Sequence, residues 1–560
     1  MKINNVNTGL YTAPKATVTQ HTQKEKDNFI KGNNSDDLQI YKPVIPENKK
    51  PQEASSDMSE GISVSAALFP SPSGEALKTI DIIYTNDIHG AISPSIDSKN
   101  PGTLTGGVSY IGSLIKKLKD ENQGKNILLD GGDWALGTYE SRLTGGKVLI
   151  DVMNNLGYDA AEIGNHEFDW GKEPLKDMLA EADFPVLGAN ILEDGKLMEG
   201  VKPYIIKEVN GLKIGIIGVI TPETPETLDP KCIVGMKFEN ARDTVEKYLP
   251  EVRKNGADLL VVLSHLGDKE DEKLAETIQG IDVIVGGHSH TFMEEGKKIN
   301  NTIIVQSGTG GKKVGELKLN IDGATKKIVS FKNNLIPVNN SNLKPDSEIE
   351  NIISPVMEIA KRNMSEVIGE TQVDLTHDRK KVLETVMGNV VTDALRISAV
   401  SDIAFENSGG IRDQIMKGKM IFGDLYKVLP FDSTTVAIMD LTGKEIKEIL
   451  EYSAKKVKDN LQVSGITMDI DPQKPEGNKV SNIKVQGIAL EDNKIYKVAT
   501  DDFIATGVDY ATFKEGKNLS YGEPTIEAFK SYIKKHSPLT EEFAKIEGRI
   551  NYLNPPKENN

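Results

Sequence analysis

Six short apolar runs in the first half of the chain are each followed by a polar turn and then by a helix-like stretch. The runs are residues 80–85, 126–129, 159–163, 213–220, 258–263 and 281–285. Between them, stretches such as 110–121 and 241–254 have the apolar spacing of amphipathic helices. Buried strands that alternate with helices predict an α/β layered domain. Two further strand-like runs, 301–306 and 314–321, place the end of this domain near Pro337.

The second half of the chain has a mixed pattern. It begins with a charged helical stretch, 345–363, in which Pro355 is predicted to start or kink a helix. Beyond it, strand-like runs at 436–441 and 496–503 lie beside a helix-like stretch at 443–457. Strands and helices in this irregular order predict an α+β arrangement.

The two ends of the chain are expected to lack a packed core. Residues 1–77 are rich in Asn, Lys, Ser, Thr and Pro, and such a segment buries too little apolar surface to offset its ordering entropy. We therefore expect a disordered amino-terminal tail there and a frayed tail at 552–560. Residues 1–20 never provide the roughly 7–15 continuous apolar residues of a secretory signal, so no such signal is expected.

Composition excludes several classes of protein. Lys and Arg number 67 and Asp and Glu number 83, so the net charge is 67 − 83 = −16, which disfavours binding to a nucleic-acid duplex. The single cysteine, Cys232, excludes an intramolecular disulfide framework and a thiolate zinc cluster. No run approaches the roughly 18 apolar residues of a transmembrane segment. The oligomeric state is left open.

Five of the eight histidines lie in motifs that directly follow strand-like runs. The motifs are NDIHG with Asp87 and His89, DGGD with Asp133, GNHEFD with Asn165 and His166, SHLGD with His265, and GGHSH with His288 and His290. Ligands bind outside the carboxyl ends of strands in open α/β sheets, so these side chains are expected to converge. A single His after a strand is more often a core or turn residue, but five such motifs in one order favour a metal site.

The chemistry of this set indicates the kind of metal. Imidazole, carboxylate and amide oxygen without sulfur suit Mn, Zn, Fe or Co. One carboxylate shared between two groups of ligands would hold two ions roughly 3.5–4 Å apart, the arrangement used in phosphoester hydrolysis.

The ordered motifs D-x-H, GGD, GNHEFD, SHLG and GGHSH resemble those of the calcineurin-like metallophosphoesterases. GNHEFD together with GGHSH resembles the 5′-nucleotidase branch, with its UDP-sugar hydrolases and 2′,3′-cyclic-nucleotide phosphodiesterases. The resemblance covers about residues 79–550. It implies an α/β fold: a four-layer metallophosphoesterase β-sandwich flanked by helices, with a second α+β substrate-binding domain.

The expected organisation follows from this resemblance. It comprises a tail at 1–77, a calcineurin-like metallophosphoesterase domain at 78–338, a linker helix at 339–365, a 5′-nucleotidase carboxy-terminal nucleotide-binding domain at 366–551 and a tail at 552–560.

The resemblance also implies roles for the motif residues. One divalent ion takes Asp87, His89, Asp133 and His290, and the other takes Asp133, Asn165, His265 and His288. His166 and Asp169 form a catalytic dyad, in which the imidazole stabilises charge on the reacting phosphate. The two ions would activate a water molecule near neutral pH and neutralise phosphate oxygens. Glu167 receives no role.

Substrate-binding residues are implied in the second region. They are Asn407, Arg412, Phe431, Phe503 and Asp509. Taken alone, each Phe is more often core and each charge a surface group. Two aromatic rings can nevertheless sandwich a base, which contributes ~0.5–1.5 kcal/mol beyond area burial, while Arg412 would bind phosphate and Asp509 would accept from ribose.

One segment departs from the family pattern. Lys381, Leu383 and Val386 stand where relatives supply arginines and an Asn before Met-Gly-Asn. Lysine presents a charge without the planar fork of arginine. The departure bears on substrate preference rather than on metal-dependent hydrolysis.

The resulting hypothesis is a hydrolase that removes phosphate from nucleoside 5′-monophosphates through a water activated by two metal ions. Hydrolysis of 2′,3′-cyclic nucleotides or of UDP-sugars remains an alternative, and a non-catalytic nucleotide-binding surface protein is a more remote one. Relatives commonly act outside the cytoplasm, which suggests an extracytoplasmic or cell-envelope location, although no secretory signal is visible.

Overall fold

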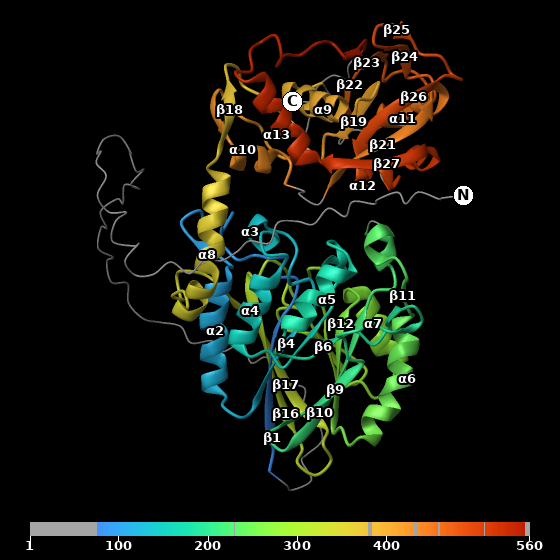
Figure 1. Cartoon of the computed structure of the whole chain (residues 1–560). Helices are drawn as coiled ribbons and strands as arrows, with labels where there is room; N and C mark the ends of the chain where they lie inside the picture. Colours follow the sequence, from blue (N-terminus) through green and yellow to red (C-terminus); the bar gives the residue numbers. More distant parts are fainter. Residues whose placement is uncertain are drawn as a thin grey trace, which may run out of the picture. The chain divides into compact units, whose positions relative to one another are not determined.

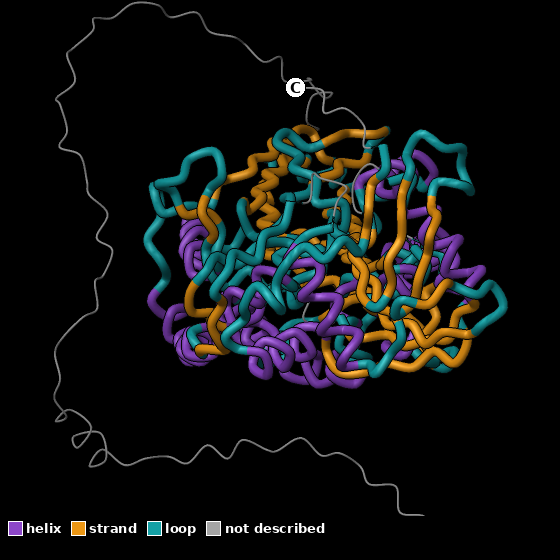
Figure 2. The backbone as a smooth tube through the Cα atoms, turned by 90° about the horizontal axis from the view of Figure 1, so that it is seen from above, coloured by secondary structure: helices purple, strands orange, loops and turns teal. Residues whose placement is uncertain are grey.

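The computed structural model describes residues 76–228, 230–378, 384–430, 434–456, 460–508 and 510–554. Several predictions fall on other residues. They concern almost all of the tail at 1–77, the end of the tail at 552–560, Lys381, Leu383, Phe431 and Asp509, and these lie outside the described residues. Figure 2 traces the backbone coloured by secondary structure, and both helices and strands recur throughout the described chain.

A six-stranded sheet is built from the first strands of the chain and from two later ones. Its order is β17 (Ile328–Pro337), β16 (Lys313–Ile321), β1 (Lys78–Thr85), β4 (Asn126–Asp130), β5 (Ala160–Glu162) and β6 (Val186–Leu187). Strands β1, β4, β5 and β6 run parallel, and β16 and β17 add an antiparallel edge.

A second six-stranded sheet follows the same plan. Its order is β14 (Lys297–Ile299), β15 (Thr302–Val305), β13 (Val283–Val285), β12 (Leu259–His265), β10 (Leu212–Ile220) and β9 (Tyr204–Val209). The four inner strands are parallel, and β14 and β9 are antiparallel edges.

The two sheets pack face to face, and helices cover their outer faces. Side chains alternate along a strand, so Ile82 of β1 packs with Leu263 of β12 in one core between the sheets, whereas Ile83 packs with α-helical residues in a second core. A third core lies behind the second sheet and contains Val262. In Figure 1, α2 and α4 lie on one side of the strands and α6 on the other. The predicted four-layer α/β sandwich is confirmed.

The outer helices have the expected amphipathic character. They are α2 (Val108–Glu121), α3 (Tyr139–Arg142), α4 (Lys147–Leu156), α5 (Lys172–Glu181), α6 (Ala241–Lys254) and α7 (Asp268–Thr277). Small strands lie between these elements: β2 (Ser95–Ile96) pairs with β3 (Leu104–Thr105), and β11 (Met236–Phe238), β7 (Ile191–Glu193) and β8 (Lys196–Leu197) form a three-stranded sheet.

Helix α8 (Ser347–Met364) lies within the stretch predicted to be a linker helix. The Asp346 side chain caps it by accepting hydrogen bonds from Glu348 N and Ile349 N. Pro355 lies inside this continuous helix, so the prediction that Pro355 starts a helix is wrong: the cap at Asp346 determines the start.

The remaining part of the chain is an α+β structure, as predicted. A five-stranded sheet has the order β22 (Leu461–Ser464), β19 (Ile403–Asn407), β26 (Ile495–Asp501), β21 (Thr435–Thr442) and β27 (Lys517–Pro524). Two smaller sheets contain β18 (Val367–Thr371) with β20 (Gly418–Ile421), and β25 (Ile488–Ala489), β24 (Val480–Val485), β23 (Ile466–Ile470) and β28 (Ile550–Tyr552). The helices are α9 (Val386–Ser398), α10 (Phe422–Val428), α11 (Gly443–Ser453), α12 (Asp502–Ala505) and α13 (Thr525–His536).

Two predicted elements end earlier than expected. The strand predicted at 496–503 ends at Asp501, because the Asp501 side chain accepts from Ile504 N and caps α12. Helix α11 ends at Ser453 rather than at 457.

Within the described residues, no helix is long and apolar enough to span a bilayer.

Candidate metal centre

Both sheets of the sandwich contribute side chains to one centre. From the first sheet, the segments after β1, β4 and β5 supply the Asp87, Asp133 and Asn165 motifs. From the second sheet, His265 is the last residue of β12, and the histidines of the GGHSH motif follow β13. Because the strands within each sheet are parallel, their carboxyl ends lie together at one end of that sheet.

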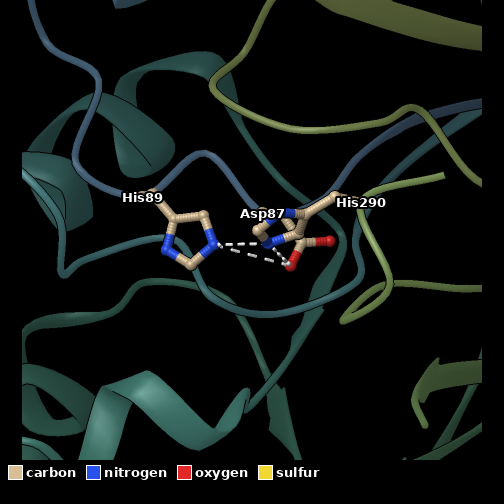
Figure 3. Close-up of side chains that lie close together, drawn as sticks. All are labelled: Asp87, His89 and His290. Carbon is tan, nitrogen blue, oxygen red and sulfur yellow. Dashed lines mark hydrogen bonds and ion pairs between the residues drawn. The ribbon is translucent and has the colours of Figure 1, made fainter. Parts of the chain in front are cut away.

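The first group of candidate ligands is Asp87, His89 and His290. One ligand atom from each residue lies within 4.8 Å of the others. The two Nε2 atoms of His89 and His290 are 2.9 Å apart, and His290 Nε2 is 3.4 Å from Asp87 Oδ1, as Figure 3 shows. Three donor atoms that point at one small volume are suited to a divalent cation.

The second group is Asp133, His265 and His288, whose ligand atoms also lie within 4.8 Å of one another. His265 Nε2 is 3.1 Å from Asp133 Oδ2, and the same carboxylate oxygen is 3.8 Å from His89 Nε2 in the first group. Asp133, a member of the second group, therefore also approaches the first group. Asn165 Oδ1 is buried and accepts no hydrogen bond from the described residues, and a cation would satisfy this orphaned acceptor. The donor set fits divalent ions.

The backbone at the candidate ligands is strained. Asp87, His89, Asp133, His288 and His290 all have positive φ angles, between 49° and 75°. Non-glycine residues rarely adopt this left-handed region, and such strain concentrates at functional sites. Five of the seven candidate ligands adopt this left-handed conformation, which packing alone would not explain. The fold therefore holds these residues in a strained backbone conformation that directs their side chains toward the centre.

Backbone carbonyl groups orient two of the imidazoles. His89 Nδ1 lies 3.1 Å from Leu136 O, and His265 Nδ1 lies 2.7 Å from Gly131 O. A carbonyl oxygen only accepts, so Nδ1 carries the proton in each ring. Nε2 of each ring is directed at the centre, and its lone pair would become available as a ligand once a cation displaces any proton held there.

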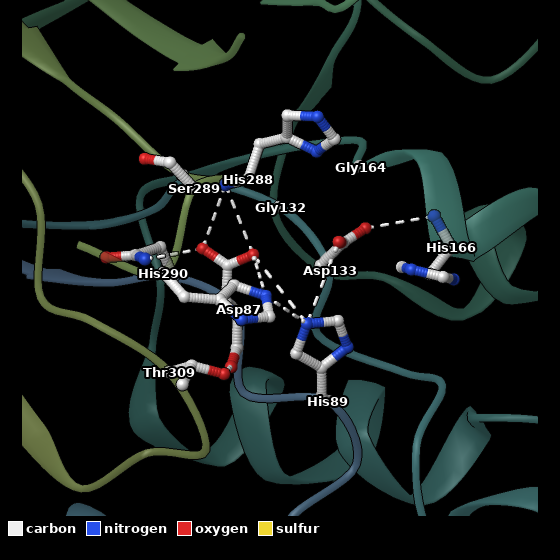
Figure 4. Close-up of polar contacts among 12 residues, drawn as sticks. Asp87, His89, Gly132, Asp133, Gly164, His166, His288, Ser289, His290 and Thr309 are labelled. Carbon is white, nitrogen blue, oxygen red and sulfur yellow. Dashed lines mark hydrogen bonds and ion pairs between the residues drawn. The ribbon is translucent and has the colours of Figure 1, made fainter. Parts of the chain in front are cut away.

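The two carboxylates are fixed by hydrogen bonds as well. His288 N donates to both oxygens of Asp87, at 3.1 and 3.0 Å, and His166 N donates to Asp133 Oδ1 at 2.9 Å, as Figure 4 shows. Burial raises the pKa of Asp133, but the neighbouring His265 outweighs burial and holds that pKa well below its usual range. Asp133 is therefore ionised and available as a ligand.

His166 and Asp169 lie beside the ligand groups and form a hydrogen-bonded pair. His166 Nδ1 is 2.7 Å from Asp169 Oδ2, and the His166 ring centroid is 5.4 Å from that of His89. Burial lowers the pKa of His166, but the Asp169 hydrogen bond and the charge of Asp133 raise it to about 9. The surrounding protein charges thus favour the cationic form of His166, which can donate a hydrogen bond. Its side chain is 36% exposed and is therefore accessible to a ligand.

The substrate-binding residues predicted from sequence are placed in part. Asn407 ends β19 and is buried, and its Oδ1 accepts from Gly410 N. Arg412 is exposed, and Phe503 lies on α12 with 49% of its surface exposed. Strands β19 and β26 are parallel neighbours, so Asn407, at the end of β19, and Phe503, just after β26, lie at the carboxyl ends of adjacent strands.

Glu167 was missed by the sequence reasoning. Its side chain is fully buried, and its carboxylate accepts from Asp133 N at 2.9 Å, Gly164 N at 2.8 Å and Ala135 N at 3.0 Å. It therefore clamps the Asp133 turn to the turn that carries Asn165. The only signal in the sequence was the position of Glu167 inside the GNHEFD motif, in which Asn165, His166 and Asp169 already had predicted roles.

We expect Glu167→Gln to weaken divalent metal binding by roughly 10–100-fold, the typical cost of losing a partner that orients a ligand. The amide group would place a donor against backbone N–H groups that need an acceptor. Isothermal titration with Mn²⁺ measures the effect, and Glu173→Gln, on an exposed glutamate of α5, is the control. Equal Mn²⁺ affinity in both variants would show that the clamp does not hold the ligands.

Two family models match this chain. Residues 80–292 match the calcineurin-like phosphoesterase model, and residues 367–515 match the model of the 5′-nucleotidase carboxy-terminal domain. The first match contains every candidate metal ligand, and the second contains all the predicted substrate-binding residues.

Comparisons with individual proteins give the same family. A 5′-nucleotidase from Diplobatis ommata is 31% identical over 530 residues, which cover 85% of this chain and 90% of the relative. The trifunctional nucleotide phosphoesterase protein YfkN from Bacillus subtilis (strain 168) is 30% identical over 86% of this chain, but the chain spans only 35% of the length of that relative. The crystal structure of a 5′-nucleotidase precursor from Thermus thermophilus superposes with a TM-score of 0.63 and 32% identity, over 85% of this chain and 100% of that one.

Proposed function

Because this chain belongs to the 5′-nucleotidase family, we propose that it is a metal-dependent phosphohydrolase that removes phosphate from nucleoside 5′-monophosphates. The observation that carries the proposal is the pair of ligand groups, which approach each other at Asp133, with the His166–Asp169 pair beside them. A protein that only bound nucleotides would need neither the ligands nor the dyad.

Two divalent ions are the proposed cofactors. Asp87, His89 and His290 would hold one, Asn165, His265 and His288 would hold the other, and Asp133 would contact both. When bound, the ions supply Lewis acidity toward phosphate oxygens and an activated water. Their identity among Zn, Mn, Co and Fe is open.

The residues of the chain perform the remaining steps of the proposed reaction. The imidazolium of His166 donates a charge-assisted hydrogen bond to a phosphate oxygen as charge develops in the transition state. Asp169 accepts from His166 Nδ1, so it keeps the ring oriented and favours its cationic form. Together they stabilise the transition state more than the ground state.

The nucleoside would be held by the second, carboxy-terminal domain, with proposed bounds of 366–551, and the metal centre by a first domain at 78–338. Phe503 supports the proposal because half of this large apolar side chain is exposed, which is suited to stacking on a base. Phe431 is its proposed partner. Arg412 would bind phosphate, Asp509 would accept from ribose hydroxyls, and Asn407 would contact the substrate.

Hydrolysis of 2′,3′-cyclic nucleotides or of UDP-sugars is the second candidate. Two observations favour keeping it: the name of the B. subtilis relative, a trifunctional nucleotide phosphoesterase, and the missing arginines around Lys381 and Leu383. A broader substrate range would follow from a weaker grip on the terminal phosphate.

An assay of phosphate release tests the proposal. AMP, 2′,3′-cyclic AMP, a UDP-sugar and bis-4-nitrophenyl phosphate are compared, each with and without a chelator. We expect AMP to have the highest kcat/KM and the chelator to abolish release. Preference for the cyclic nucleotide or the UDP-sugar would select the second candidate, and no release with any substrate would favour the non-catalytic binder.

A further inference from the structure

The amide group of Gln306 contacts the turn that carries two of the candidate metal ligands. Gln306 directly follows β15, whose parallel neighbour β13 leads into the GGHSH motif. The residue is fully buried. A buried amide needs partners for both its oxygen and its nitrogen, so the partners of Gln306 show what this side chain does.

The two ends of the amide bind the turn at three places. Gln306 Oε1 accepts from Ser289 Oγ at 3.1 Å and from Thr291 N. Gln306 Nε2 donates to Gly287 O at 2.9 Å. These partners fix the orientation of the amide, since a backbone N–H only donates and a carbonyl oxygen only accepts. They lie before, between and after the two histidines of the motif, so one side chain holds the backbone around both.

The backbone of this turn needs such support. His288 and His290 have φ angles of 75° and 57°, in the left-handed region that non-glycine residues rarely adopt. A strained conformation of this kind persists only where the surrounding structure over-determines it. His290 belongs to the first group of candidate ligands and His288 to the second. Gln306 therefore supports one imidazole of each group.

The residues that follow Gln306 extend this support to the first sheet. Ser307 N and Ser307 Oγ both donate to Asn86 Oδ1, at 2.7 and 2.6 Å. Asn86 Nδ2 in turn donates to Asp87 Oδ2 at 2.6 Å. Thr309 Oγ1 donates to Asp87 O, and Figure 4 shows Thr309 beside Asp87. The segment after β15 contains none of the predicted ligands, yet it contacts the segments that carry three of them.

We propose that Gln306 is a positioning residue for both metal ions, because its amide holds the turn from which each ligand group takes one imidazole. The inference rests on the proposed function, in which two ions bind at these groups. Neither group contains Gln306 itself. Its removal should therefore lower the affinity for both ions and leave the ligands, and the chemistry of the loaded centre, in place.

Gln306→Met tests this inference, because methionine has a similar size but no donor and only a weak acceptor. The metal-stripped full chain is titrated with Mn²⁺ well below its melting temperature. We expect the affinity for each ion to be roughly 10–100-fold lower than in the wild type. At Mn²⁺ concentrations that saturate the variant, kcat for AMP should return to within about twofold of the wild type. Loss of a general structural role would keep kcat low under the same condition.

Two further variants make the test specific. Ser289→Ala removes one of the three bonds to Gln306 at an exposed position, so it should fold normally and lower the affinity for both ions by roughly two- to tenfold. Gln279→Met makes the same substitution at an exposed glutamine just after α7, and it should leave both affinities unchanged. If Gln306→Met cannot be prepared in folded form, Ser289→Ala against Gln279→Met decides.

The possible failures are distinguishable. A wild-type chain that binds fewer than two Mn²⁺ ions would overturn the proposed function and this inference with it. A wild-type chain that binds two ions without hydrolysing AMP would overturn the proposed substrate and leave the affinity comparison in force. Two bound ions in the wild type, with unchanged affinities in Gln306→Met, would overturn the inference alone. A loss at one ion only, or a kcat that stays low in the saturated variant, would overturn it as well.

Discussion

Replacing His166 with alanine should lower kcat for AMP by roughly 10²–10³-fold or more, the range for a lost acid–base or electrostatic group. The reason is its place: His166 lies beside the ligand groups, bonded to Asp169, but neither group of candidate ligands contains it. Metal content should therefore stay at the wild-type level. Steady-state kinetics and elemental analysis of the same preparation measure both quantities.

His536→Ala provides the matched control, because this imidazole packs against Tyr532 and Phe543 in the carboxy-terminal part. It should leave kcat unchanged. A His166→Ala variant with near wild-type kcat would show that the dyad is structural, and a variant that had lost its metal would show that His166 belongs to the ligand set.

Changing Asp133 to asparagine should lower the affinity for both metal ions together. The loss should exceed the ~10–100-fold that follows from removing a residue that only orients a ligand. Asp133 is the residue whose carboxylate oxygen approaches both ligand groups, at 3.1 Å from His265 Nε2 and 3.8 Å from His89 Nε2. Asparagine keeps the size of the side chain but removes its charge. We expect activity with AMP to be lost at metal concentrations that saturate the wild type.

The comparison with Asp87→Asn makes the prediction selective. Asp87 belongs to the first group alone, so the Asp87→Asn substitution should lower the affinity for one ion and leave the other ion bound. Two fully occupied ions and normal turnover in Asp133→Asn would contradict the bridging assignment, as would loss of a single ion in that variant.

Much of the metal centre could be predicted from sequence, because its signals are local. Strands buried on both faces read as continuous apolar runs, and β1, β4, β10 and β12 were found in this way. The polar residue that follows each run, such as Asp87 or His288, then marks the carboxyl end of a strand. Convergence needs only that the strands be parallel, which the intervening helices imply.

Other features depend on contacts between distant residues and left no such signal. The clamp of Glu167 on Asp133 N, across 34 positions, consists of backbone donors, which every sequence has. The positive φ of His89 and His290 reflects the folded environment rather than residue type. The strand at β17 was missed because its outer residues, such as Lys332, are polar on an edge.

Element ends were mispredicted where a side chain competes with regular structure. Residues 496–503 read as one apolar-alternating strand, yet Asp501 caps a helix instead and turns Phe503 out of the sheet. This local competition places Phe503 where it can meet a ligand. The prediction of Phe503 as a substrate-binding residue came from family resemblance.

The central claim is that two divalent ions, held by these ligands, are required for hydrolysis of a nucleoside monophosphate. The most direct test is to strip the full chain with a chelator, titrate it with Mn²⁺, and follow bound ions and phosphate release from AMP in parallel. We predict saturation at two ions per chain, with release appearing only as the ions bind. Saturation at one ion, or release that persists in the stripped protein, would contradict the claim.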